Sequence, residues 1–113
     1  MCGCTTSKEV VSYTRVETSK AKEMMGETEH YILLDVRTVE EYNDGHIEGA
    51  INLPLDEIEE KAISTLPNLN QPIFVYCRSG NRSKTASQQL VELGYTNIIE
   101  MGGIIDWEGN IVK

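Results

Sequence analysis

The segment from Cys77 to Ser83 (Cys77-Arg78-Ser79-Gly80-Asn81-Arg82-Ser83) carries the side chains best suited to chemistry in this chain. It follows an apolar run that predicts a strand and precedes a pattern that predicts a helix. Such a turn points several backbone N–H groups into one small bowl beside the positive end of the helix dipole. The bowl favours an anionic sulfur, and Arg78 and Arg82 strengthen the positive field. We therefore expect Cys77 to exist substantially as the nucleophilic thiolate near neutral pH.

The residues around this segment predict strands that alternate with helices. Short apolar or β-prone runs predict strands at residues 13–16, 31–36, 50–53, 73–76 and 97–100. The run at 31–36 is almost continuously apolar, which is typical of a strand buried on both faces of a parallel sheet. Residues that can cap a helix predict helix starts at Thr18, Thr38, Asp56 and Ser83. Thr38 and Glu41 have the spacing of a capping box.

Glycines mark the expected ends of these elements. Gly26 and Gly94 are expected to end helices in a left-handed conformation. Gly102 and Gly103 predict a flexible turn, and residues 104–107 predict a last helical turn that packs back on the domain. The alternation predicts an α/β fold with a mainly parallel central sheet flanked by helices. In such sheets the ligand site lies at the carboxyl ends of the strands, where Cys77 falls.

Length and composition predict one folded domain. The chain has 113 residues, of which 40% are hydrophobic and 25% are charged, values typical of a globular domain. We expect residues 1–12 to form a flexible tail and residues 13–113 to form the domain. The formal net charge of −8 would repel nucleic acid and anionic membrane surfaces, so we expect no nucleic-acid partner. No apolar run is long enough for a transmembrane segment, and a small acidic domain without an apolar stripe is most simply a monomer.

Two further cysteines, Cys2 and Cys4, lie in the N-terminal tail and leave three interpretations open. They are free thiols in a flexible tail, a weak metal or redox pair without further ligands, or the remnant of a bacterial lipoprotein with its lipid anchor at Cys2. No apolar signal segment is present to decide the third interpretation. The location is accordingly the cytoplasm, or outside the bacterial cytoplasm after removal of a signal peptide. We expect neither a metal nor a cofactor.

Four ordered motifs resemble the rhodanese family of single-domain sulfurtransferases. They are residues 34–37 with Glu41, residues 45–54, residues 75–83, and residues 102–104 with Trp107. The resemblance extends from about Tyr13 to Trp107. Glu48 replaces the proline that usually follows the His-Ile pair of the family, in a segment that does not carry the chemistry. The resemblance implies a three-layer rhodanese-like fold and a sulfurtransferase activity.

The resemblance also implies how sulfur would move. The Cys77 thiolate would take the sulfane sulfur of a donor such as thiosulfate and hold it as a Cys77 persulfide. An acceptor such as cyanide, a small thiol or a partner protein would then remove it. The remaining residues of the segment would bind the substrate, because their N–H groups would stabilise the persulfide and the arginines would hold an anionic donor: Arg78, Ser79, Gly80, Asn81, Arg82 and Ser83.

Three residues near the expected site are assigned structural roles. Asp35 and Arg37 follow a strand end, where we expect an ion pair that fixes the adjoining loops. His46 lies in a short glycine-flanked turn and is expected to hydrogen-bond the neighbouring backbone. A role as catalytic base is less favoured because His46 has no evident orienting partner.

Alternative functions remain open at this point. A tyrosine phosphatase needs a longer loop between its cysteine and arginine than the four residues between Cys77 and Arg82, so the loop favours one sulfur atom over a phosphoryl group. A rhodanese module that only binds a protein partner commonly lacks the nucleophile. The intact Cys77 therefore favours an enzyme, with sulfur delivery to a protein as an intermediate possibility.

Overall fold

The structure, a computed structural model, describes residues 12–113. Its helices are α2 (Thr18–Glu27), α3 (Val39–Asp44), α4 (Ile58–Thr65) and α5 (Asn81–Glu92), with short 3-10 turns η1 (Leu55–Glu57) and η2 (Ile104–Asp106). Its strands are β1 (Thr14–Arg15), β2 (Ile32–Asp35), β3 (His46–Ile47), β4 (Ile51–Asn52), β5 (Ile73–Cys77), β6 (Ile98–Gly103) and β7 (Ile111–Val112). Cys2 and Cys4 lie outside the described residues, and with them the interpretations of the N-terminal pair.

Five strands form a parallel sheet in the order β1-β6-β5-β2-β4. Strand β5 lies in the middle, paired with β2 on one side and β6 on the other. All five of its residues are buried, because helices cover both faces of a parallel sheet and leave no side exposed to water. Its last residue is Cys77. The predicted parallel sheet, with Cys77 at its carboxyl edge, is confirmed.

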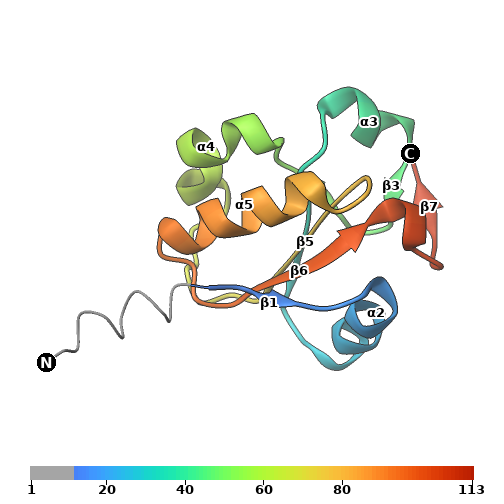
Figure 1. Ribbon diagram of the computed structural model, residues 1–113, viewed down its shortest axis with the longest axis horizontal. Helices are drawn as coiled ribbons and strands as arrows, with labels where there is room; N and C mark the ends of the chain where they lie inside the picture. Colours follow the sequence, from blue (N-terminus) through green and yellow to red (C-terminus); the bar gives the residue numbers. More distant parts are fainter. Residues whose placement is uncertain (1–11) are drawn as a thin grey trace, which may run out of the picture.

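Helices cover the two faces of this sheet in separate layers. Figure 1 shows α4 and α5 on one face and α2 on the other. Neighbouring residues of β5 belong to different cores: Val75 packs with residues of α4 and α5, whereas Phe74 packs with residues of α2. This division follows from the alternation of side chains along a strand. The three-layer α/β arrangement that the sequence predicted is therefore confirmed.

Several predicted helix starts and ends differ from the structure. Glu17, not Thr18, is the N-cap of α2, and Gly26 lies inside this helix, which continues to Glu27. Asp56 lies within η1 and does not cap α4. A glycine permits a helix to end but does not require it, so packing of α2 on the sheet decides where that helix stops.

A second, two-stranded sheet was not predicted from the sequence. Strands β3 and β7 pair antiparallel, with His46 opposite Val112 and Ile47 opposite Ile111. Each strand has two residues, too few for an alternating pattern to be recognised. Figure 1 shows this pair beside the C-terminus.

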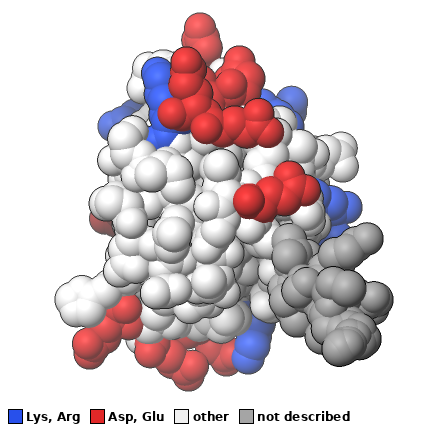
Figure 2. All heavy atoms as spheres, turned by 90° about the vertical axis from the view of Figure 1, so that its left-hand side faces the viewer, with Lys and Arg blue, Asp and Glu red and all other residues white. Residues whose placement is uncertain are grey.

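The surface charge is unevenly distributed. Figure 2 shows Asp and Glu side chains gathered at the upper and lower edges of one face, with a broad central area that carries neither sign. The chain as a whole has 18 acidic and 10 basic residues, and on this face the acidic side chains lie in patches. Among residues 12–113, no helix combines the length and the apolar character that crossing a membrane requires.

Candidate active site

The loop after β5 encloses the sulfur of Cys77. The Sγ atom accepts hydrogen bonds from the backbone N–H of Gly80 at 3.0 Å and of Ser83 at 3.3 Å. Gly80 adopts a left-handed conformation with φ of 107° and occupies the N-cap of α5, a conformation that glycine reaches without steric strain. Cys77 is only 1% exposed. Two N–H donors and the start of a twelve-residue helix thus converge on one buried sulfur, an arrangement that stabilises negative charge there.

The end of β6 supports this loop by direct backbone contact. A Cβ atom at Gly103 would lie 2.1 Å from the carbonyl oxygen of Arg78, so only glycine fits. The N–H of Ile105 donates to the same Arg78 oxygen at 3.3 Å. The sequence-based interpretation of Gly102 and Gly103 as a flexible turn was wrong, because both residues belong to β6. Glycine is needed here for close approach of two backbones.

Arg82 faces a carboxylate of α3. Its Nη1 and Nη2 atoms donate to Oε1 and Oε2 of Glu41 at 2.7 and 3.0 Å. The hydrogen bond from Arg82 is the main cause that lowers the pKa of Glu41 to about 2. Glu41 also accepts from the Thr38 N–H at 3.1 Å, as the predicted capping box requires. The Arg82 charge is therefore largely compensated, and the pair ties α3 to the start of α5.

The other residues of the loop differ in their exposure to solvent. Arg78, Ser79 and Asn81 are exposed, whereas Gly80 and Ser83 are buried. Of the two arginines expected to hold an anionic donor, Arg78 is thus the exposed one.

A buried polar network lies beside the loop at the end of β2. Asp35 is fully buried and receives two parallel hydrogen bonds from Arg37, Nε to Oδ1 at 3.0 Å and Nη2 to Oδ2 at 2.7 Å. Burial alone would lower the pKa of Arg37, but the hydrogen bonds and the charge of Asp35 raise it. The Tyr76 hydroxyl donates to Asp35 Oδ2 at 2.7 Å, and burial together with this bond raises the pKa of Tyr76. The ion pair between Asp35 and Arg37 that the sequence predicted is present.

His46 contacts the backbone, as expected, although it lies in β3. Its Nδ1 atom is 2.9 Å from the carbonyl oxygen of Tyr42. The two rings stack with centroids 3.8 Å apart. This geometry fits a structural role.

Ser83 and Glu100 form a contact that sequence reasoning missed. Ser83 is the third residue of α5, and Gly80 is its N-cap. The prediction that Ser83 caps this helix was therefore wrong. Its hydroxyl donates to Glu100 Oε2 at 2.5 Å and lies 3.5 Å from Cys77 Sγ. Glu100 is fully buried and also accepts from the Gly102 N–H at 2.8 Å. A charged residue within the apolar run of β6 was the only signal that could have indicated it.

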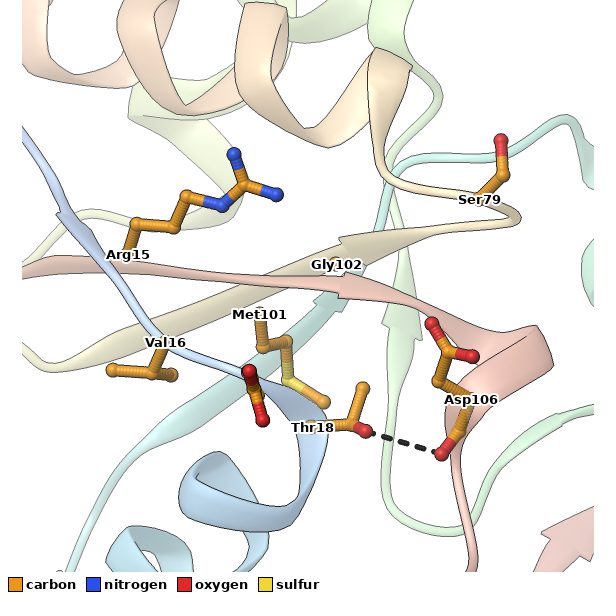
Figure 3. Close-up of a pocket in the computed structure, with 8 residues that line it drawn as sticks. Arg15, Val16, Thr18, Ser79, Met101, Gly102 and Asp106 are labelled. Atoms are coloured by element: carbon orange, nitrogen blue, oxygen red, sulfur yellow. Dashed lines mark hydrogen bonds between the residues drawn. The ribbon is translucent and has the colours of Figure 1, made fainter.

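A cavity of about 590 Å³ opens between the Cys77 loop and the edge of the sheet. Arg15 and Thr18 line it from the N-terminal side, Ser79 from the loop, and Gly102 and Asp106 from the C-terminal side, as Figure 3 shows. The Thr18 hydroxyl donates to the Asp106 carbonyl oxygen at 3.1 Å across the cavity. Cys77 is not among the residues that line this cavity.

Comparison with known proteins identifies the family. Residues 17–110 match the Rhodanese-like domain family. The chain belongs to the rhodanese family. The thiosulfate sulfurtransferase PspE of Escherichia coli (strain K12) is 42% identical over 78 residues, covering 69% of this chain and 73% of PspE. The putative sulfur carrier protein YrkF of Bacillus subtilis (strain 168) is 33% identical over 104 residues, covering 91% of this chain and 55% of YrkF.

A solved rhodanese structure has the same fold. It is a rhodanese with anions from E. coli, which is 38% identical and superposes with a TM-score of 0.69, covering 74% of this chain and 98% of that chain. The sequence-based assignment to the rhodanese-like sulfurtransferases is therefore confirmed. The rhodanese loop of this chain departs from expectation at Arg82, which is ion-paired, and at Ser83, which contacts a buried carboxylate.

Proposed function

We propose that this rhodanese transfers sulfane sulfur from thiosulfate to a thiophilic acceptor through a persulfide on Cys77. The observation that carries the proposal is the pair of N–H donors from Gly80 and Ser83 on the Cys77 sulfur. Donors fixed in advance around a site of developing negative charge stabilise an anionic intermediate without reorganisation. The name of PspE supports thiosulfate as the donor.

The first half of the cycle loads the sulfur. The Cys77 thiolate forms a bond to the outer sulfur of thiosulfate, the S–S bond of thiosulfate breaks, and sulfite leaves with the bonding electron pair. The negative charge remains on the terminal sulfur of the persulfide. The N–H groups that contact Cys77 Sγ stabilise the neighbouring negative charge, and the exposed Arg78 attracts the dianionic donor.

The second half returns the enzyme to its starting state. The carbon of cyanide attacks the terminal sulfur, the persulfide S–S bond breaks, and thiocyanate leaves while the bonding pair returns to Cys77 as thiolate. A small thiol would accept the sulfur in the same way. Arg82, held by Glu41, contributes to this cycle by fixing the loop more than by gripping the donor.

The intact mass of the reduced protein after incubation with thiosulfate tests the proposal. The protein should gain one sulfur atom, cyanide should remove it, and Cys77→Ala should gain none. A variant with Cys2→Ser and Cys4→Ser is the matched control, and it should still gain the sulfur. Loading of the Cys77→Ala variant would contradict the assignment of the nucleophile, and a wild-type protein that gains no sulfur would point to another donor or a module that only binds a partner.

Sulfur delivery to a protein acceptor is the second candidate, favoured by the similarity to a putative sulfur carrier protein. The same persulfide would form, but turnover with cyanide or small thiols would be slow. Rapid, complete release of the loaded sulfur to cyanide would argue for the small-molecule cycle.

A further inference from the structure

We propose that Glu100, acting through the Ser83 hydroxyl, is the internal acceptor of the Cys77 thiol proton. This inference deepens the proposed function and rests on it, because sulfur transfer requires the thiolate. Glu100 does not touch the sulfur and is therefore a positioning residue, whose effect passes through Ser83.

The three groups form a continuous line of hydrogen bonds. Cys77 Sγ is 3.5 Å from Ser83 Oγ, and Ser83 Oγ is 2.5 Å from Glu100 Oε2. All three residues are at most 1% exposed. Among the hydrogen bonds of residues 12–113, the other partners of Sγ are the N–H groups of Gly80 and Ser83, which only donate. Ser83 Oγ is accordingly the partner that can take the thiol proton.

The single proton of the Ser83 hydroxyl has a preferred acceptor. Its Oγ also lies 3.1 Å from the carbonyl oxygen of Gly80 and 3.4 Å from that of Gly102. The Glu100 carboxylate is closer and charged, and charged acceptors form the stronger hydrogen bonds. When this proton points to Glu100, a lone pair of Ser83 Oγ remains to accept the thiol proton.

The step transfers two protons in line and leaves the net charge of the site unchanged. The Cys77 S–H bond breaks and its proton binds Ser83 Oγ, while the original Ser83 proton moves to Glu100 Oε2. The products are a Cys77 thiolate, an intact serine hydroxyl and a neutral carboxylic acid. Negative charge thus moves from the buried carboxylate to the sulfur, where two N–H groups stabilise it.

Charged groups on the surrounding elements fit this exchange. From β1, the Arg15 Nε lies 3.3 Å from Glu100 Oε1, but its side chain is 58% exposed. From α5, the guanidinium of Arg82 is paired with Glu41. From β5, Cys77 itself is the titratable neighbour. Helix α2 packs against Ile99 and Met101 on the opposite face of the sheet. The Glu100 charge is therefore only partly compensated, which favours its neutralisation when the thiolate forms.

The pH dependence of Cys77 alkylation by iodoacetamide tests the exchange without any sulfur donor. In the wild-type protein the alkylation rate should stay level over the pH range in which the pair holds one proton. In Glu100→Gln, the rate should instead rise about tenfold per pH unit, because the thiol must lose its proton to solvent. Ser83→Ala, which interrupts the line, should behave like Glu100→Gln. Ser87→Ala is the matched control, because Ser87 is also fully buried in α5 and its hydroxyl has no hydrogen-bond partner among residues 12–113. This variant should keep the wild-type profile.

Infrared difference spectra of the wild-type protein give a second readout that needs no substitution. Formation of the anionic persulfide with thiosulfate should produce the C=O band of a protonated carboxyl group. This band should be absent in Glu100→Gln. A persulfide that forms by mass without the band, or identical alkylation profiles for the wild type and Glu100→Gln, would overturn the role of Glu100 and leave the sulfurtransferase proposal intact. Failure of the proposed function itself would show as the absence of any persulfide.

Discussion

Replacement of Gly103 by alanine should damage both the stability and the chemistry of the loop. The added Cβ would lie 2.1 Å from the Arg78 carbonyl oxygen, where ordinary contact begins at 3.4 Å. The obstacle is backbone, so β6 and the loop must separate by about 1 Å. We expect this overpacking to lower the free energy of unfolding by about 1–3 kcal/mol. A displacement of this size at Cys77 should slow the proposed formation of a persulfide by about 100-fold.

Gly26→Ala is the matched control for this prediction. Gly26 lies on the exposed side of α2, and no atom of the described part of the chain lies within 4 Å of the position of an added Cβ. Alanine there should raise the free energy of unfolding by about 0.5–1 kcal/mol and leave the chemistry unchanged. Urea unfolding gives the free energies, and the rate of sulfur gain by mass gives the chemistry. A Gly103→Ala protein with the stability and loading rate of Gly26→Ala would refute the argument that close backbone approach holds the loop.

Three further substitutions test the contacts around the site. Glu41→Gln should lower the free energy of unfolding by about 1 kcal/mol at pH 7. The effect is small because the side chains of Arg82 and Glu41 are 35% and 30% exposed. The pKa of Glu41 in the folded state is lowered from 4.5 to about 2, so the stabilisation is present above pH 4.5 and is lost as the pH falls toward 2. If urea unfolding gave the same loss of free energy for Glu41→Gln at pH 7 and at pH 3, the ion-pair argument would be contradicted. Asp35→Asn leaves the Arg37 charge buried without its partner and should cost about 3–5 kcal/mol, and a loss below 1 kcal/mol in the same assay would argue against the ion pair. Tyr95→Phe removes the hydrogen bonds from the Tyr95 hydroxyl to the carbonyl oxygens of Ala62 and Leu66. It should lower the free energy of unfolding, measured by thermal unfolding, by about 1–2 kcal/mol and leave sulfur loading unchanged.

Local patterns were sufficient for the five strands of the parallel sheet and for one helix start. Residues 73–76 could be identified as a buried strand because a strand covered on both faces must be apolar throughout. The capping box of Thr38 and Glu41 could be identified because its two hydrogen bonds span a constant three residues. The antiparallel pair of β3 and β7 could not, because two-residue strands joined across the chain carry no repeating pattern.

The sequence by itself determined the family and the strand-turn-helix that surrounds Cys77 with N–H groups, and it predicted Cys77 as the nucleophile, because these depend on residues that are neighbours in the chain. The tertiary structure decided which charges meet at the site. Arg82 pairs with Glu41 across 41 positions, and Ser83 meets Glu100 across 17. These contacts depend on the order of β6, β5 and β2 in the sheet, which places α3 after β2 and α5 after β5 next to each other. Side chains far apart in sequence come within hydrogen-bond distance only after the strands have paired and the helices have packed on them.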